Sequence, residues 1–87
     1  MKVETLHITL EKGLYARLAT IFCQKAFSYA SHIWLEKDGR KVNGKSLLGV
    51  LSLGLTSGSE VKVIVEGIDE DIALAEIEAF LTSKTVG

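Results

Sequence analysis

The sequence predicts an α+β fold of the open-faced sandwich type, in which a four-stranded antiparallel sheet carries its helices on one face, in the order βαββαβα. Three observations support this prediction. Apolar and polar residues alternate in four short segments, apolar residues recur at helical spacing in three others, and an Asp-Gly pair joins two of the alternating segments. Helices on one face leave the other face of the sheet open to water.

Alternation places the strands and indicates which side chains point inward. The first alternating segment ends at "EKG" (11–13), "HIWLEK" (32–37) forms the second, and the "DG" hairpin signal leads into a short strand at 41–43. The strongest strand is "EVKVIVEG" (60–67), because its β-branched residues favour the pleated conformation. The residues predicted to face the core are Leu6, Ile8, Leu10, Ile33, Leu35, Val61, Val63 and Val65.

Three segments show helical spacing. The first runs to about residue 28, and the second, "SLLGVLSLGL" (46–55), opens with the N-cap residue Ser46 and is kept short by its two glycines. Asp69 is predicted to cap the last helix. The buried stripes comprise Ala19, Phe22, Cys23 and Ala26 in the first helix, and Ala73, Leu74, Ile77 and Leu81 in the last.

The length and the net charge of the chain exclude several classes of function. A chain of 87 residues forms one domain, 1–87, with room for a core and little room for a substrate cavity, so we predict a protein that is not an enzyme. The net charge of −1 gives no broad field to attract nucleic acid or an anionic membrane, and we predict direct contact with neither. The basic residues gather once, in "EKDGRKVNGK" (36–45).

The cysteine and the histidines form no pattern typical of a metal or redox site, so no cofactor and no metal are predicted. Cys23 has no second cysteine to pair with and lies on an apolar helix face, which favours a core role in a reducing compartment. His7 and His32 fall on the outward side of their strands, where a solvated role is expected. There is no signal-like start and no run of about 18 apolar residues, so a cytoplasmic location is expected.

The open face of the predicted sheet is expected to present two large apolar side chains, Trp34 and Ile64. Together they would form a contact patch, although single exposed apolar residues are ordinary on protein surfaces. The sequence leaves both interpretations open.

Two motifs carry the functional information. "GLYARLAT" (13–20) puts Tyr15 and Arg17 at the start of a helix, where the positive end of the macrodipole disfavours a cation unless an anion meets it. "VNGKSLLGVLSLG" (42–54) puts Ser46 at the start of a helix that is too short to bury all of its leucines. The leucines expected to include exposed members are Leu47, Leu48 and Leu51.

These motifs, in register along essentially the whole chain with the closing "EGIDED" (66–71), resemble the histidine-containing phosphocarrier (HPr) family of the bacterial sugar phosphotransferase system. The first motif of the family has an active-site histidine and a proline, where this chain has Tyr15 and Leu18. Tyrosine forms a stable phosphate ester instead of a labile P–N bond, and neither His7 nor His32 matches the active position. The resemblance therefore implies an HPr-like fold without histidine phosphocarriage.

The regulatory half of the pattern is retained. Ser46 with its apolar neighbours, together with Arg17, is similar to the catabolite repression HPr-like branch, in which the histidine is absent and the serine remains. This resemblance implies that an HPr kinase/phosphorylase phosphorylates Ser46 with ATP, and that the product acts as corepressor for a catabolite-control transcription factor. Arg17 would contact either the phosphate or an acidic group of the partner. The implied partner-binding residues are Tyr15, Arg17, Leu47, Leu48 and Leu51.

Two other interpretations stay open. One is a phosphocarrier-related protein of the phosphotransferase system with an unusual acceptor, and the other is a diverged HPr-like domain with another binding role. Acid-labile phosphate formed from phosphoenolpyruvate would favour the first of these. The sequence leaves a homodimer open as well.

Overall fold

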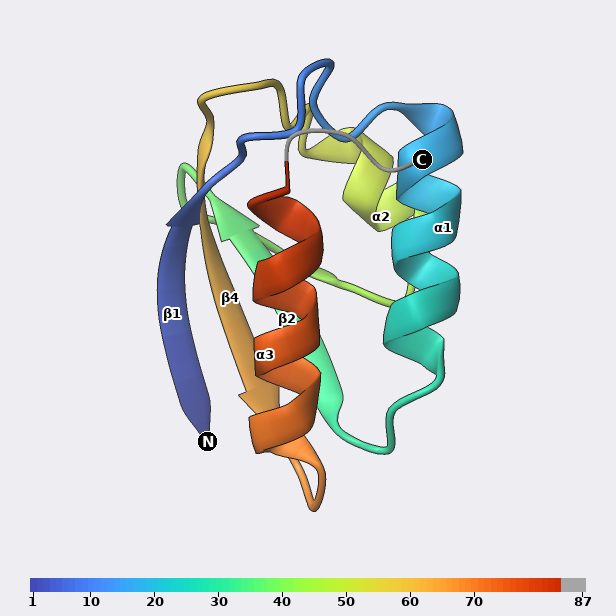
Figure 1. The fold of residues 1–87 in the computed structure, drawn as a ribbon, viewed down its shortest axis with the longest axis vertical. Helices are drawn as coiled ribbons and strands as arrows, with labels where there is room; N and C mark the ends of the chain where they lie inside the picture. The colour runs from blue at the N-terminus through green and yellow to red at the C-terminus, as the bar shows by residue number, and fades with distance from the viewer. Residues whose placement is uncertain (84–87) are drawn as a thin grey trace.

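The computed structural model describes residues 1–83 and confirms the order βαββαβα. The elements are β1 (Lys2–His7), α1 (Ala16–Phe27), β2 (His32–Lys37), β3 (Arg40–Asn43), α2 (Leu47–Ser52), β4 (Glu60–Glu66) and α3 (Glu70–Leu81). The four strands form one antiparallel sheet in the order β1-β4-β2-β3, so the chain pairs its first strand with its last. Helices α1 and α3 run alongside each other in front of this sheet, and α2 packs beside α1 (Figure 1).

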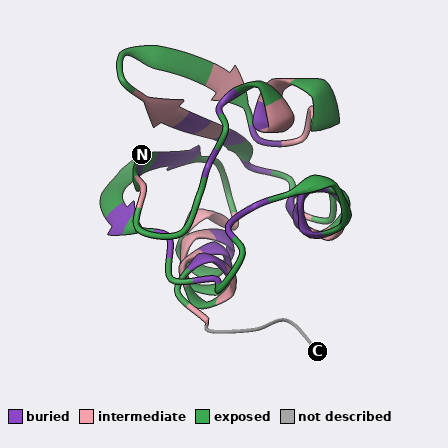
Figure 2. Ribbon diagram, turned by 90° about the horizontal axis from the view of Figure 1, so that it is seen from above, coloured by how far each residue is buried: buried purple, intermediate pink, exposed green. Residues whose placement is uncertain are grey.

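The core lies between the sheet and the helices, where the buried positions gather in Figure 2. The predicted inward side chains of β4, Val61, Val63 and Val65, are completely buried. The predicted helix stripes are also buried, except that Leu74 is only partly covered. Phe22 of α1 meets Phe80 of α3 with ring centroids 5.9 Å apart, so the two helices share one apolar layer.

The first strand ends earlier than the alternation predicted. β1 stops at His7, yet Ile8 and Leu10 are still buried. The backbone of Ile8 leaves the ladder and pairs with the loop before β4, because its N–H donates to the Ser59 carbonyl at 2.8 Å and its carbonyl accepts from Gly58 at 2.7 Å. The alternation therefore gave the correct inward phase and an incorrect strand end.

The hairpin between β2 and β3 is of the predicted Asp-Gly kind. Asp38 has φ 52° and Gly39 has φ 81°, so both central residues of the turn are left-handed. Such a turn matches the twist of the two strands that it joins.

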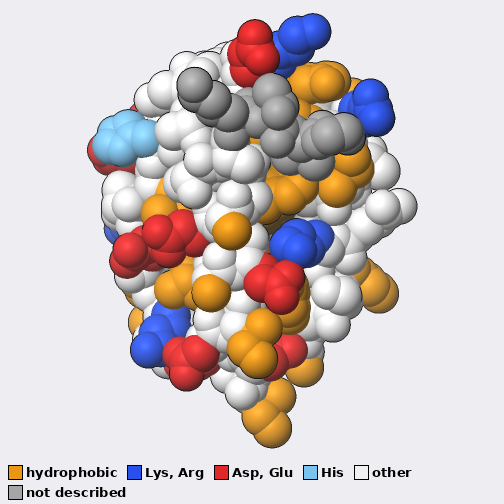
Figure 3. Space-filling view, in the orientation of Figure 1, with side chains coloured by type: hydrophobic (Ala, Val, Ile, Leu, Met, Phe, Trp, Pro, Cys, Tyr) orange, Lys and Arg blue, Asp and Glu red, His pale blue; other side chains and the backbone are white. Residues whose placement is uncertain are grey.

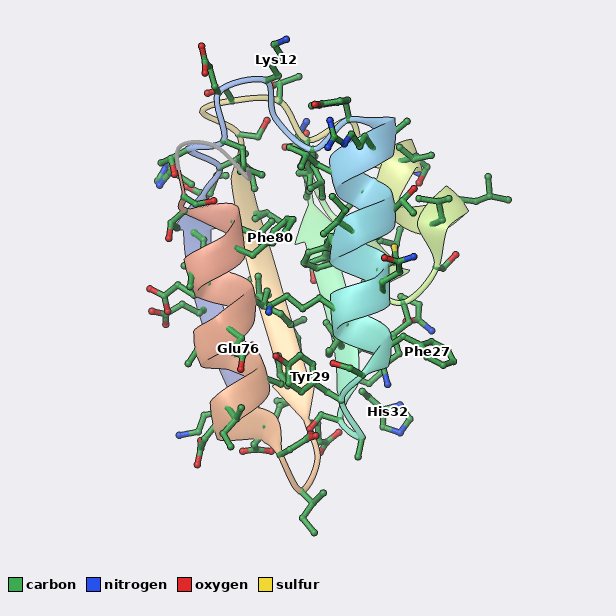
Figure 4. All side chains as sticks on the ribbon, turned by 45° about the vertical axis from the view of Figure 1, so that its right-hand side comes forward. Lys12, Phe27, Tyr29, His32, Glu76 and Phe80 are labelled. Atoms are coloured by element: carbon green, nitrogen blue, oxygen red, sulfur yellow. The ribbon has the colours of Figure 1, made fainter. Side chains whose placement is uncertain are left out.

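Helices α1 and α3 are also joined by polar contacts near the end of α1. Lys25 donates from Nζ to the Glu76 carboxylate at 2.8 Å, and Tyr29 lies close by between the two helices (Figure 4). Burial raises the pKa of Tyr29 to about 12, and its hydrogen bond with Glu76 adds to the rise. The hydrogen bond from Lys25 lowers the pKa of Glu76. These contacts join the end of α1 to α3.

The predicted cap of the last helix is wrong in its hydrogen bonds. Asp69 occupies the N-cap position of α3, but its side chain makes no cap bond to that helix. Its carboxylate instead accepts hydrogen bonds from the backbone N–H groups of Ala30 and Ser31, at 2.8 and 2.9 Å, and from the Ser31 hydroxyl. The bonds from Ser31 and Ala30 lower the pKa of Asp69. Asp69 therefore fixes the loop before β2, because the tertiary fold brings these stronger partners within reach.

Candidate functional site

Ser46 stands at the N-cap of α2, as predicted. Its backbone is extended, with φ −100° and ψ 113°, and its Oγ accepts a hydrogen bond from the Gly49 N–H at 3.2 Å. The Ser46 carbonyl accepts the first helical bond, from the Val50 N–H at 2.9 Å. The side chain is half-buried, so the hydroxyl lies at the surface while it satisfies one of the free amides of the first turn.

The leucines of α2 divide as the short helix predicted. Leu48 is 81% exposed and Leu47 is 38% exposed, whereas Leu51 is partly buried against the core and Val50 is completely enclosed. An apolar surface therefore lies directly beside Ser46. Leu51 forms its inner edge, and Leu48 is its outermost part.

The start of α1 differs from the start of α2, because no side chain caps it. Tyr15 is at the N-cap position, but it makes no side-chain cap bond, and the first turn of α1 contains no acidic residue. Tyr15 is 43% exposed. Arg17 is exposed and has no ion-pair partner among the residues that the structure describes. This helix start therefore combines free amides with an available cation and contains no anion of its own.

Helices α1 and α2 pack against each other, so the fold places both predicted motifs on one side of the molecule. A shallow groove of about 350 Å³ runs between them, lined by Thr20, Cys23, Gln24, Phe27, Lys45 and Leu47. Lys45 is held at this groove because its Nζ donates to the Tyr29 carbonyl at 2.8 Å. The groove joins the leucine surface of α2 to the side of α1.

Phe27 is a surface residue that the sequence analysis missed. It is 74% exposed at the end of α1 and points away from the core in Figure 4. The signal was present in the sequence, because Phe27 directly follows Ala26 of the buried stripe and so points off that stripe. An aromatic residue at such a position extends the apolar surface away from Ser46.

The cysteine and the two histidines lie where the sequence predicted them. Cys23 is buried, as predicted, and burial raises the pKa of its thiol. His7 and His32 are exposed on the open sheet face, with His7 Nε2 3.7 Å from a Glu60 carboxylate oxygen. Within residues 1–83, no three His, Cys, Asp or Glu side chains are grouped so that they could hold a metal ion. None of the helices in that range is long and apolar enough to cross a membrane.

The fold and these two helix starts define a small sheet-and-helix protein of the HPr type. A family model described as "PTS HPr component phosphorylation site" matches residues 2–83. The chain therefore belongs to the HPr family, as the two motifs predicted.

Within the family, the chain is similar to the Crh branch. It is 42% identical to the HPr-like protein Crh of Bacillus subtilis over 84 residues, which cover 97% of this chain and 99% of the relative. A crystal structure of the phosphocarrier protein HPr from Bacillus anthracis has a TM-score of 0.90 at 36% identity, covering 92% of this chain and 95% of that one. The crystal structure of Bacillus subtilis Crh, described as a swapped dimer, has a TM-score of 0.77 at 39% identity and covers all of both chains. The predicted fold and family are both confirmed.

Proposed function

We propose that this chain is a regulatory HPr-like protein of carbon catabolite repression. HPr kinase/phosphorylase phosphorylates Ser46, and the phosphorylated protein then acts as corepressor for a catabolite-control transcription factor. The proposal is supported by the similarity to Crh, one structure of which is described as that of a catabolite repression protein. The observation that carries it is the half-buried Ser46 hydroxyl at the start of α2, directly beside the exposed Leu47 and Leu48.

The surroundings of Ser46 suit an added phosphate. Phosphorylation adds a charge of about −1.5 to −2 and three acceptor oxygens. Neither α1 nor the segment 40–53 contains an acidic residue, whereas Arg17, Lys45 and Arg40 lie in these parts of the chain. The Gly49 N–H that now donates to Ser46 Oγ is available to a phosphate oxygen in its place. The segments around Ser46 and its packed neighbour α1 therefore supply cationic side chains and no carboxylate, which favours an added phosphate.

The partner-binding surface consists of Leu47, Leu48 and Leu51 with Tyr15 and Arg17. The leucines supply an apolar centre, and the arginine and the phosphate supply a charged rim. Arg17 contacts either the phosphate or an acidic group of the partner. The lack of an ion-pair partner for Arg17 within residues 1–83 supports both roles equally.

The chain has no role as a histidine phosphocarrier or as an enzyme in this proposal. Tyr15 stands where the family has its histidine, and its phosphate ester would not pass the phosphoryl group on. We place the protein in the cytoplasm, where the phosphotransferase system and its kinase act. A homodimer is also proposed, and the dimeric structure of Crh supports it.

The test is incubation of the purified chain with an HPr kinase/phosphorylase and ATP, followed by mass-spectrometric mapping of the phosphate. The parent and a Ser57→Ala control, which changes an exposed loop serine, should be labelled. The Ser46→Ala variant should not be labelled. Undiminished labelling of folded Ser46→Ala protein would refute the proposal, and acid-labile phosphate on the parent after incubation with the phosphoenolpyruvate-dependent enzyme would favour a phosphocarrier instead.

A second measurement addresses the corepressor step. The Ser46-phosphorylated chain should bind the catabolite-control transcription factor more tightly than the unmodified chain does, as measured by calorimetry. Equal binding of the two forms would leave a phosphoprotein without the proposed corepressor role.

A further inference from the structure

The open face of the sheet carries a row of apolar side chains that crosses the strands. The strand register places Val3 of β1 beside Ile64 of β4, and Ile64 beside Trp34 of β2. These side chains point away from the helices, because their neighbours Val63 and Val65 are the inward ones. Val3 is 47% exposed, whereas Ile64 is only 9% exposed. Trp34 is partly exposed, since its ring stacks on His32 and the Lys41 ammonium group lies 5.3 Å from the ring centre. The contact patch that the sequence left open is therefore a continuous row over three strands.

Charged side chains flank this apolar row on both sides with inverted signs. On one side, Lys62 of β4 pairs in register with Glu36 of β2. On the other side, Glu66 of β4 pairs with His32 of β2, which is a cation when protonated. The β4 strand therefore reads positive, apolar, negative, and the neighbouring β2 strand reads negative, apolar, positive when protonated.

Such a pattern is complementary to itself. A two-fold axis along the apolar row turns a second copy over so that its two flanking rows exchange places. Lys62 of each copy then lies over Glu66 of the other, and Glu36 lies over His32 of the other. The apolar residues lie over their own copies. Rotation about the strand direction would instead place Val3 over the polar Asn43, so it would break the apolar row.

We infer that two copies of this chain associate face to face through the open sheet face, with the two-fold axis along the Val3–Ile64–Trp34 row. Sheets pack in this way when apolar side chains interdigitate between them. The contact is centred on β4 and β2, the two inner strands, because the twist of each sheet separates the edges. This contact needs neither the exchange of a segment between copies nor phosphate on Ser46.

The size of the face predicts a weak dimer. Four strands of about five residues occupy roughly 300 Å² in plan, from the usual strand spacing and rise. A stable interface buries about 800 Å² on each partner. Association should therefore be reversible and rapid, and it should appear between micromolar and millimolar concentrations. The leucine surface beside Ser46 stays free, because α2 lies on the opposite side of the sheet (Figure 1).

Charge reversal tests the geometry directly. Lys62→Glu and Glu66→Lys, each alone, should weaken self-association at least about tenfold, because like charges then face each other across the dimer. An equimolar mixture of the two variants should associate again, since the carboxylate introduced in one variant then meets the ammonium group introduced in the other. Sedimentation equilibrium measures the dissociation constant. Trp34, the only tryptophan in the chain, reports burial of the row by a blue shift of its emission.

Matched controls separate this surface from net charge and from segment exchange. Lys12→Glu and Glu11→Lys make the same charge changes in an exposed loop outside the sheet and should leave the dissociation constant unchanged. Mixing Lys62→Glu with Glu36→Lys should not restore association, because these residues do not face each other in the inferred dimer. Melting curves confirm that each variant is folded.

Three outcomes would overturn the inference. These are a parent that stays monomeric at millimolar concentration, a dimer that ignores the reversal of Lys62 or Glu66, and restoration by Glu36→Lys in place of Glu66→Lys. A dimer that ignores both reversals and exchanges slowly would also overturn the inference, because it would indicate a swapped segment in place of contact through this face.

Discussion

The helix starts on the two sides of the molecule differ in whether carboxylates lie beside them. On the α3 side, Glu70 accepts a hydrogen bond from Gly67 at 3.1 Å and also pairs with the N-terminal amine, while Asp69 fixes the loop before β2. Acidic side chains accordingly lie over α3 in Figure 3. On the α1–α2 side, neither first turn contains an acidic residue, and only the Ser46 hydroxyl acts as a cap.

This difference separates stability from function. A helix start with its own carboxylates is already neutralised, so it has little to offer an external anion. A helix start without them keeps free amides, and at α1 it also keeps the cation of Arg17, which has no ion-pair partner within residues 1–83. We therefore expect substitutions on the α1–α2 side to change phosphorylation and partner binding with small effects on folding. Substitutions at Asp69 should have the opposite effect.

The largest expected effect is a gain of function at Tyr15. Tyr15→His places an imidazole at the start of α1, where the free amides and Arg17 favour an incoming phosphoryl group. The variant should acquire acid-labile phosphate from the phosphoenolpyruvate-dependent enzyme, while the parent acquires none. The gain should be incomplete, because small misplacements of a reacting group lower rates by about 100-fold.

The double variant Tyr15→His, Leu18→Pro sharpens this test. Residue 18 is the third residue of α1, within the first turn, so a proline there removes no helical hydrogen bond and restricts the backbone. It should raise the transfer rate above that of the single variant. No transfer in either folded variant would mean that the docking surface for the phosphoryl donor has also been lost.

The next largest effect should come from Leu48. Leu48→Asp puts a charge into the apolar centre of the proposed partner surface, and a charge buried without a partner is costly. The Ser46-phosphorylated variant should bind the transcription factor at least about tenfold more weakly. Ile72→Asp is the matched control, since Ile72 is also exposed but lies on α3. Equal weakening by both substitutions would contradict a specific surface.

Asp69 tests whether the carboxylates on the α3 side stabilise the fold. Its folded-state pKa is lowered from 3.8, so its carboxylate stabilises the fold above that pH, and the contribution disappears as the pH falls through the lowered value. Asp69→Asn should therefore melt at a lower temperature than the parent at neutral pH, with a smaller difference in acid. Asp71→Asn, which removes an exposed pair with Lys2, should change the melting temperature little. A pH-independent difference for Asp69→Asn would exclude the carboxylate charge as its cause.

Substitutions at the two N-cap positions on the α1–α2 side should give the smallest effects, of opposite sign. Ser46→Ala removes the bond to Gly49 and should lower the free energy of unfolding by about 1 kcal/mol. Tyr15→Ser offers a cap that α1 now lacks and should raise it by about 0.5 kcal/mol. Urea denaturation with an unchanged m-value measures both. A loss of stability in Tyr15→Ser would show that the tyrosine ring has a packing role.

The sequence by itself determined the features that depend on residues close together in the chain. The alternation in β4 and the helical spacing in α1 predicted the buried side chains, because the periods of strands and helices follow from the backbone alone. The Asp-Gly hairpin and the Ser46 cap were equally predictable, since each depends on residues within three positions of one another. The length of α2 also predicted that its leucines would be partly exposed.

Only the tertiary structure decided the features that depend on residues far apart in the chain. The Asp69 carboxylate accepts hydrogen bonds from Ala30 and Ser31 instead of capping α3, because the fold brings that loop next to it. β1 ended early because Ile8 found partners beside β4. The charge pattern around Ile64 likewise exists only through strand register, which places Lys62 beside Glu36 and Glu66 beside His32. Sequence alone specifies such pairs poorly, because a register shift of one residue would turn every side chain of a strand to the other face.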